Sequence, residues 1–272
     1  MAIHPNKAPK GTALITGASS GIGAIYADRL AHRGYDLILV ARDSKRLAGV
    51  AERLTGETGR RVEIVTADLT DKADQRRIEE RLRSDTDITM LVNNAGVGAT
   101  APMIQSDADS LESMIELNVI ALTRLTSAVV PGFVERHNGI IINISSIAAL
   151  APEILNGTYS GTKAFVLNLT QSLHHEVSAH GVQVQAVLPG ATSTEFWDRA
   201  GTTVSALPEQ IVMSAAEMVD ASLAALDQHE LITIPSLPDA GDWEKANSAR
   251  IALGPNLSRN HAADRYKVSQ AA

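Results

Sequence analysis

The chain has 272 residues, of which 44% are hydrophobic and 20% are charged, and its formal net charge is −7 at pH 7. This acidic balance argues against a nucleic-acid partner, because such binding depends on basic patches that neutralise phosphates. The absence of cysteine excludes disulfides, thiolate nucleophiles and sulfur-ligated metal sites.

Short apolar runs rich in β-branched residues alternate along the chain with longer segments of helical periodicity. The runs predict strands at Thr12–Thr16, Asp36–Ala41, Val62–Val65, Ile88–Val92, Ile140–Ile144, Val182–Leu188 and Leu231–Ile234. The periodic segments predict helices at Ile22–Arg33, Lys45–Thr58, Lys72–Arg83, Leu111–Arg136, Tyr159–His180 and Ala215–Gln228. This alternation indicates an α/β fold, with a doubly wound parallel sheet of about seven strands and helices on both faces.

The ends of the chain differ in character from its centre. Residues 1–10 are polar with two prolines, and no stretch there resembles a signal peptide, so we expect an N-terminal extension and a cytoplasmic protein. No run is expected to span a membrane. Residues 11–235 show no composition break and are expected to form a single domain. Residues 236–272, with one plausible helix from Asp242 to Leu253, are expected to extend that domain.

The segment Thr16–Gly23 reads TGASSGIG and lies between the first predicted strand and the first predicted helix. In dinucleotide-binding folds of the Rossmann type, such glycines make a tight turn and let the backbone approach a pyrophosphate, which the helix N-terminus attracts. The alternative is a glycine-rich helix start with no ligand. The order of strand, turn and helix favours a cofactor site.

The end of the second predicted strand favours NADP over NAD. At this place dinucleotide folds carry an acidic residue for the ribose hydroxyls of NAD, or an arginine for the 2′-phosphate of NADP. Here Arg42 follows Ala41, and a guanidinium pairs with a phosphate that a carboxylate would repel. Asp43 opposes this interpretation, whereas Lys45 and Arg46 would add positive charge. Alternatively, Arg42 is a solvated residue that opens the next helix.

Tyr159 and Lys163 are four residues apart in a predicted helix, so both side chains face the same side. A nearby ammonium favours the phenolate and lowers the pKa of the phenol, which makes Tyr159 a candidate acid/base group. This spacing alone is common and needs partners. Ser146 follows a predicted strand and precedes Tyr159 by 13 residues, and Ser145 is the alternative.

The TGxxxGIG turn, the Ser–Tyr spacing and the Tyr-x-x-x-Lys pair together resemble the short-chain dehydrogenase/reductase family, in its NADP-preferring type. The resemblance implies an oxidoreductase that transfers a hydride between NADP(H) and a carbonyl or alcohol. It implies that Ser146 holds the carbonyl oxygen and Tyr159 exchanges the proton. Lys163 would lower the Tyr159 pKa and bind the nicotinamide ribose, while Asn118 would hold a water linked to solvent.

The same resemblance implies a set of cofactor contacts that follow the strand ends. Besides Tyr159 and Lys163, they are Gly17, Ser19, Ser20, Gly21, Ile22, Gly23, Arg42, Asp68, Leu69, Asn94, Ala95, Gly96, Pro189, Gly190, Thr192 and Thr194. It also implies a substrate lid over residues 191–207. Phe196 and Trp197 in this lid could cover an apolar substrate such as a bulky ketone or aldehyde, or could pack the lid against the body. The predicted substrate pocket comprises Val97, Ser146, Ile154, Leu155, Tyr159, Phe196 and Trp197.

No metal is expected, because the adjacent His174 and His175 point in different directions on a helix. By resemblance, the expected partners are a small-molecule carbonyl or alcohol and further copies of the chain, in a homodimer or homotetramer built on the two long helices. Two alternatives compete with this function. A non-catalytic NADP-binding regulator or scaffold is disfavoured by the intact Asn118, Ser146, Tyr159 and Lys163 set, and an epimerase or dehydratase needs a larger substrate lobe.

Overall fold

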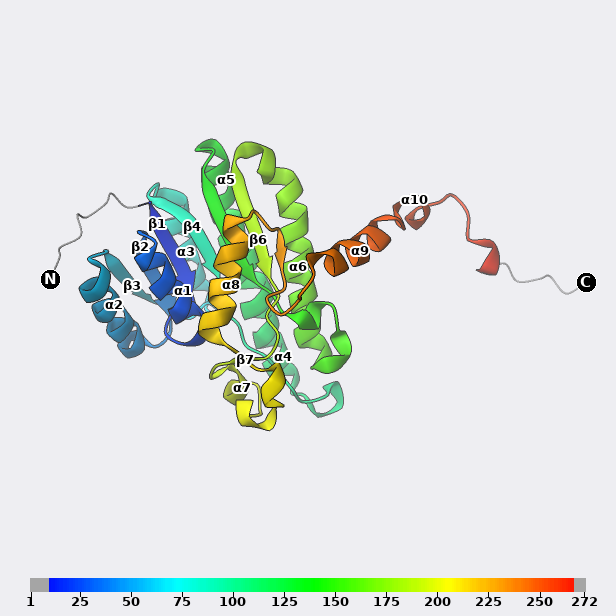
Figure 1. Cartoon of the computed structure of the whole chain (residues 1–272), viewed down its shortest axis with the longest axis horizontal. Helices are drawn as coiled ribbons and strands as arrows, with labels where there is room; N and C mark the ends of the chain where they lie inside the picture. The colour runs from blue at the N-terminus through cyan, green and yellow to red at the C-terminus, as the bar shows by residue number, and fades with distance from the viewer. Residues whose placement is uncertain (1–9, 267–272) are drawn as a thin grey trace, which may run out of the picture. The chain divides into compact units, whose positions relative to one another are not determined.

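A seven-stranded parallel sheet forms the centre of the protein in the computed structural model, which describes residues 10–266 (Figure 1). The strand order is β3-β2-β1-β4-β5-β6-β9, so the winding reverses between β1 and β4. The strands are β1 (Thr12–Thr16), β2 (Asp36–Ala41), β3 (Val62–Thr66), β4 (Ile88–Asn93), β5 (Gly139–Ile144), β6 (Val182–Val187) and β9 (Ile232–Thr233). All seven predicted strands end within one residue of their predicted bounds, and the doubly wound sheet is confirmed.

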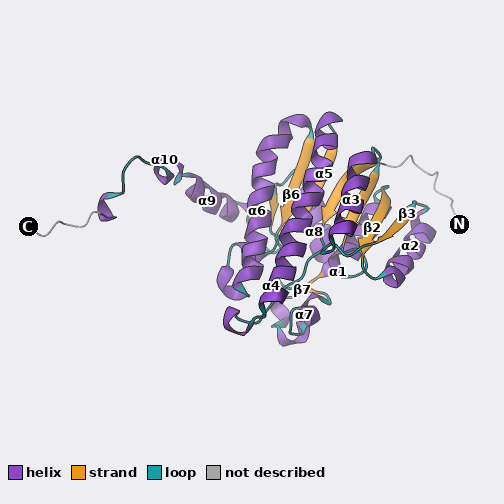
Figure 2. Cartoon of the chain, turned by 180° about the vertical axis from the view of Figure 1, so that it is seen from behind, coloured by secondary structure: helices purple, strands orange, loops and turns teal. Residues whose placement is uncertain are grey.

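Helices cover both faces of this sheet. On one face lie α1 (Gly21–His32), α2 (Ser44–Thr58) and α8 (Ala215–Asp227), and on the other lie α3 (Lys72–Ser84), α5 (Leu122–Glu135) and α6 (Gly157–Val177) (Figures 1 and 2). The strands from β1 to β6 contribute side chains to both cores: Leu14 packs on the α3–α5–α6 side, and Ile15 packs on the α1–α8 side. Burial on both faces explains why the strands are continuous apolar runs.

The predicted helix Leu111–Arg136 is divided into three parts. The chain forms α4 (Ala108–Ile115), a π-helical turn (Glu116–Ala121) and α5. Contrary to our expectation, this stretch, Ala108–Glu135, is long and apolar enough to cross a membrane by length and composition, although 44% of its most apolar window is buried in the fold. Phe133 of α5 is completely buried in the core, as is typical of the central helix of a globular domain.

The remaining elements are short. The lid region contains a two-stranded parallel pair, β7 (Thr192–Ser193) and β8 (Met213–Ser214), with α7 (Phe196–Arg199) between them. The 3-10 turns are Met103–Gln105, Ile147–Ala149, Pro152–Ile154, Ser178–His180, Val204–Ala206 and Glu209–Ile211.

The chain divides after Pro235 into two compact units. The second unit contains α9 (Ala240–Ile251), α10 (Gly254–Leu257) and a 3-10 turn (Asp264–Tyr266), and none of their residues is buried. Helix α9 matches the helix predicted for the tail. The assignment of residues 236–272 to the same domain stays a prediction, and nearly all of the predicted extension over residues 1–10 lies outside the described residues.

A buried hydroxyl pair ties α1 to α8. The Tyr26 hydroxyl lies 2.5 Å from Ser222 Oγ, and both residues are completely buried. We expect Tyr26→Phe to lower the free energy of unfolding by about 1–2 kcal/mol, because a buried hydrogen bond is lost and Ser222 keeps only the more distant Gln185 as a side-chain partner. Urea denaturation would measure the change. The exposed Tyr266 is the control, and equal stability of the Tyr26 variant and the unchanged protein would contradict this expectation.

Candidate active site

The predicted cofactor residues gather at one edge of the sheet. Because the strands are parallel, their carboxyl ends lie at the same edge, and ligands in such sheets bind where the strand order reverses. Here that place lies between β1 and β4. The predicted residues follow the strands as Gly17–Gly23 after β1, Arg42 after β2, Asp68 and Leu69 after β3, Asn94–Gly96 after β4, and Pro189 to Thr194 after β6.

The glycine turn cannot accept side chains at its key positions. Gly17 and Gly21 have φ values of +68° and +55°, which favour glycine, and a Cβ added to Gly23 would overlap the Gly17 carbonyl oxygen. Asn94 braces this turn, since its Nδ2 donates to the carbonyl oxygens of Thr16 (2.9 Å) and Gly17 (3.2 Å). The Asn94 side chain therefore holds the turn in shape, and its predicted contact with the cofactor stays a prediction.

The N-terminus of α1 is open to an anion. Its N-cap residue Ser20 makes no side-chain capping hydrogen bond, and the first turn contains no acidic residue. In contrast, Asp43 caps α2 and Asp71 caps α3. Unsatisfied N–H groups and the positive end of the helix dipole together suit a phosphate. The turn and the helix start therefore fit the pyrophosphate of a dinucleotide.

The arginines beyond β2 differ in their partners. Across residues 10–266, the one carboxylate within ion-pair distance of Arg42 is Asp68, at 3.9 Å, and the Arg42 side chain is 68% exposed. Arg46 instead forms an ion pair with Glu195, since its Nη1 donates to both carboxylate oxygens, at 2.6 and 2.8 Å. Arg42 is thus the arginine that can turn its guanidinium to a new anion.

The catalytic candidates meet where β5 ends and α6 begins. Asn156 caps α6, which buries Tyr159 and Lys163 on one face. The Ser146 side chain acts on the Tyr159 hydroxyl and favours its charged form, and its Oγ also accepts from the Ala148 N–H at 3.1 Å. Ser145 points elsewhere, because its Oγ donates to the Lys163 carbonyl oxygen at 2.8 Å. The structure therefore brings Ser146, and not Ser145, to the tyrosine.

Burial controls the protonation of this pair. It raises the pKa of Tyr159 to about 12, and the effect of the Ser146 side chain offsets only part of that rise. Burial also lowers the pKa of Lys163 to about 8. The Lys163 ammonium donates to the Ile144 carbonyl oxygen at 2.9 Å and lies 5.7 Å from the centre of the Tyr159 ring. For the protein alone, the prediction that Lys163 leaves Tyr159 with a lowered pKa is therefore wrong, because desolvation of the phenol outweighs the nearby charge.

Asn118 lies in the π-helical turn, and its side chain is fully engaged. Its Oδ1 accepts from the Val97 N–H at 3.0 Å, and its Nδ2 donates to the Val97 carbonyl oxygen at 2.8 Å and to Thr162 Oγ1 at 3.1 Å. These bonds clamp the segment after β4 to α6. A Cβ added to Gly96 would lie 3.1 Å from Asn118 Oδ1, so the glycine permits this approach. The water-holding role of Asn118 stays a prediction.

An apolar cluster surrounds Tyr159. Of the predicted pocket residues, Val97, Leu155 and Phe196 pack in this cluster, and the Phe196 ring centre lies 5.8 Å from that of Tyr159. Ile154 is 48% exposed and lies outside the cluster. Sequence reasoning missed four members of the cluster, which are Ala99, Leu111, Met114 and Ala148. The three-residue spacing of Leu111 and Met114 on α4 was a signal for a shared helix face.

Trp197 is a buried residue of the lid, and its hydrogen bond and its ring contact both lie within residues 191–207. It is 7% exposed, its Nε1 donates to the Thr192 carbonyl oxygen at 3.0 Å, and its ring meets Phe196 edge-on at 5.4 Å. Phe196 thus faces Tyr159, whereas Trp197 stabilises the lid from within, and the packing of the lid against the body of the protein stays a prediction. The structure does not place Trp197 in the apolar cluster around Tyr159.

A buried polar chain, which sequence reasoning also missed, supports the site from behind. Asn93 Nδ2 donates to Asn143 Oδ1 at 2.9 Å, and Asn143 Nδ2 donates to Thr170 Oγ1 at 2.9 Å. These bonds join β4, β5 and α6, which carry the Asn94 turn, Ser146 and Tyr159. The signal was an asparagine near the end of each of two otherwise apolar strands.

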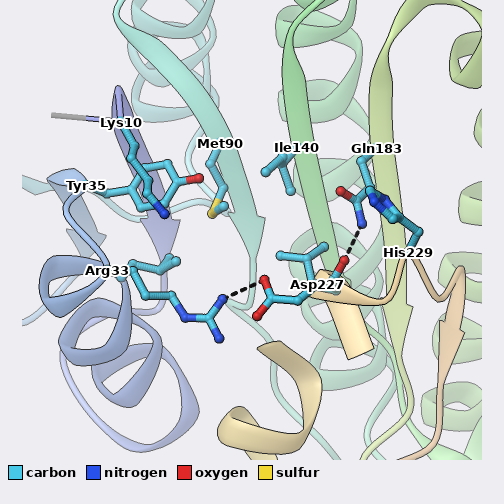
Figure 3. Close-up of a pocket in the computed structure, with 10 residues that line it drawn as sticks. Lys10, Arg33, Tyr35, Met90, Ile140, Gln183, Asp227 and His229 are labelled. Atoms are coloured by element: carbon cyan, nitrogen blue, oxygen red, sulfur yellow. Dashed lines mark hydrogen bonds and ion pairs between the residues drawn. The ribbon is translucent and has the colours of Figure 1, made fainter. Parts of the chain in front are cut away.

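A separate cavity lies at the opposite edge of the sheet, near the amino ends of the strands (Figure 3). Arg33 Nη1 donates to Asp227 Oδ1 at 2.9 Å across its wall, which joins the ends of α1 and α8. Tyr35 and Lys10 also line it. No predicted site residue lines this cavity, so it is distinct from the candidate active site.

Two solved structures resemble this chain closely. A short-chain dehydrogenase from Sphingobium yanoikuyae, in complex with NADPH, is 50% identical, with a TM-score of 0.92 over 94% of this chain and 100% of that one. The bulky-bulky ketone specific alcohol dehydrogenase from Comamonas testosteroni is 46% identical, with a TM-score of 0.86 over 94% of this chain and 98% of that one.

Curated proteins and a family model agree with these structures. Very-long-chain 3-oxoacyl-CoA reductase from Anas platyrhynchos is 36% identical over 191 residues, which are 68% of this chain but only 60% of the reductase. Human 17-beta-hydroxysteroid dehydrogenase type 3 is 34% identical over 213 residues, 78% of this chain and 66% of that protein. The model of the short chain dehydrogenase family matches residues 11–204. This chain therefore belongs to the short chain dehydrogenase family.

Proposed function

We propose that this protein is an NADP(H)-dependent oxidoreductase that interconverts a carbonyl and an alcohol, with Tyr159 as its acid/base group. The observation that carries the proposal is the burial of Ser146, Tyr159 and Lys163 together, with the Lys163 ammonium 5.7 Å from the Tyr159 ring centre, at the sheet edge that also bears the glycine turn. Two supports for the cofactor are the exposed Arg42 and the NADPH in the Sphingobium structure.

Tyr159, Ser146 and Lys163 each have a separate role in the proposed reaction. When bound, NADPH supplies the hydride. In reduction, Tyr159 donates its proton to the carbonyl oxygen, and Ser146 donates a hydrogen bond to the same oxygen. The raised pKa of Tyr159 keeps this proton in place at neutral pH. The Lys163 ammonium then stabilises the phenolate that remains, because it lies close to the ring in a site shielded from water.

The substrate that suits this site is a ketone or aldehyde with a bulky apolar body. Val97, Leu155 and Phe196 bring apolar surface to the reacting hydroxyls, together with Met114. The specificity named for the Comamonas alcohol dehydrogenase supports the same class. We further propose a homodimer or homotetramer and a cytoplasmic location. Across residues 10–266, no three acidic or histidine side chains gather to hold a metal, and a metal-free reaction stays a prediction.

A binding and turnover experiment tests the proposed function. The purified protein is titrated with NADPH and with NADH, and a panel of bulky ketones and aldehydes is then followed by the loss of reduced-cofactor absorbance. Preference for NADPH with turnover of a panel member supports the proposal. Binding without turnover across the panel supports the alternative of a non-catalytic regulator, and preference for NADH contradicts the role of Arg42.

The pH dependence of the two directions is expected to differ. The pKa of Lys163 is lowered to about 8, so its charge is present below pH 8 and lost above it. Tyr159 is mostly protonated near pH 8, because its pKa is raised to about 12, and its phenolate fraction grows as the pH rises. We expect kcat/KM for carbonyl reduction to fall above about pH 8, as the phenolate loses its stabilising charge. Alcohol oxidation needs the phenolate and is expected to rise with pH. A parallel fall in both directions would contradict this assignment.

A further inference from the structure

An ion pair ties the substrate lid to the helix that follows β2. Glu195, directly before α7, accepts hydrogen bonds from Arg46 Nη1 at 2.6 and 2.8 Å and from Arg199 Nη2 at 2.9 Å. Arg46 lies in the first turn of α2, where its Nε is 3.3 Å from Asp43 Oδ2. The pair thus joins segments that are 149 residues apart in the chain. Both side chains are about half exposed, so the pair is a contact between two long side chains at the surface of the fold.

Three consecutive lid residues contact three different parts of the site. Thr194 lies over the glycine turn, since a Cβ added to Gly21 would come 3.3 Å from Thr194 Cγ2. Glu195 binds Arg46, and Phe196 packs on Tyr159 and crowds Gly98. The ion pair therefore lies between the contact of Thr194 with the glycine turn and the contact of Phe196 with Tyr159. A displacement of Glu195 would shift both neighbours with it.

The pair contributes little to the stability of the fold as a whole. The side chains of Arg46 and Glu195 are 48% and 47% exposed, and exposed ion pairs are weak and screened by salt. The pair also removes Arg46 from competition for a phosphate, because its Nη1 is bound to both carboxylate oxygens. What remains for the pair to determine is the position of the lid, which Thr100 also holds through hydrogen bonds from its Oγ1 and N–H to the Ala200 carbonyl oxygen.

We propose that Arg46 and Glu195 form a latch that holds the lid closed and so positions Phe196 against Tyr159. Glu195 is a positioning residue, since it acts on the reaction through Phe196 and does not touch the reacting atoms. The effect on catalysis rests on the proposed function, whereas the closure of the lid does not. Opening the latch frees the segment that carries Trp197 and lowers the shielding of that side chain from solvent.

Trp197 reports on the latch without any turnover. The chain has two tryptophans, so Trp243→Phe leaves Trp197 as the single one. In that background we expect Glu195→Gln to raise the acrylamide quenching constant of Trp197 about two- to fivefold, the size set by an exposed ion pair. Added salt should raise quenching in the parent and change it little in the variant. Glu209→Gln, at an exposed carboxylate in the same region, is the control and should leave quenching unchanged.

A double-mutant cycle separates the latch from other roles of Arg46. Arg46→Gln and Glu195→Gln should each raise the quenching constant of Trp197. The constant of the double variant should be no higher than that of either single variant, because the same interaction is removed in all three. If the parent protein turns over a bulky carbonyl, each single variant is expected to raise KM for that substrate about two- to fivefold, with a smaller effect on kcat. Unchanged quenching in Glu195→Gln, or additive effects in the double variant, would overturn the latch. If the parent proves inactive, the quenching measurements on the three variants still test the latch. Failure of the proposed function is therefore distinguishable from failure of the latch.

Discussion

Replacing Tyr159 with phenylalanine is expected to lower kcat for carbonyl reduction by about 10²–10⁴-fold, because the variant lacks the hydroxyl that donates the proton. The ring itself is retained, so the contacts with Met114, Ala148 and Phe196 are expected to persist. The rate of NADPH consumption with a bulky ketone measures the change, and fluorescence titration measures NADPH binding, which should stay within about twofold of the parent.

Tyr35→Phe is the matched control for this variant. Tyr35 is a partly buried phenol at the opposite edge of the sheet, where it lines the separate cavity (Figure 3). The same chemical change there is expected to leave kcat unaltered. Activity of the Tyr159 variant within tenfold of the parent would sink the assigned mechanism, whereas a loss of NADPH binding would show that the variant had damaged the cofactor site instead.

Much of the fold is predictable because each central strand is buried on both faces. Runs such as Ile140–Ile144 then contain little but branched apolar residues, and their ends are clear in the sequence. The π-helical turn at Glu116–Ala121 was missed because it is associated with hydrogen bonds between the Asn118 side chain and the Val97 backbone. Val97 is 21 residues away, so local sequence does not indicate these bonds. The short lid elements were missed for a similar reason, since β7 forms only by pairing with β8, as in Thr192 with Met213, 21 residues away.

The candidate site was predictable where its chemistry requires fixed local spacings. The glycine turn needs glycines at set positions, and the Tyr159–Lys163 pair needs one helical turn. The pKa of Tyr159 was not predictable, because it depends on how deeply the folded chain buries the phenol. Sequence spacing likewise could not decide between Ser145 and Ser146 from chemistry alone. That choice depends on the bond from Ser145 to the Lys163 backbone.

We expect the choice between NADP and NAD to depend on Arg42. Ala41 ends β2 with no group that could bind ribose hydroxyls, and Arg42 follows with a largely exposed guanidinium. Its contact with Asp68 at 3.9 Å is long for an ion pair, so little is lost when the side chain turns to a phosphate. Arg46, by comparison, would first have to leave Glu195. We therefore expect Arg42 to carry the larger share of phosphate recognition.

We expect Arg42→Ala to weaken NADPH binding by about tenfold, the lower end of what a charge-assisted hydrogen bond contributes, because solvent screens this exposed site. NADH binding should change little, since NADH lacks the 2′-phosphate. Titration of both cofactors into the parent and the variant gives the ratio of their affinities. Arg76→Ala removes the same charge from an exposed position on α3 and should leave that ratio unchanged. An Arg42 variant that keeps the parent's preference would place phosphate recognition elsewhere, with Lys45 and Arg46 the next residues to replace.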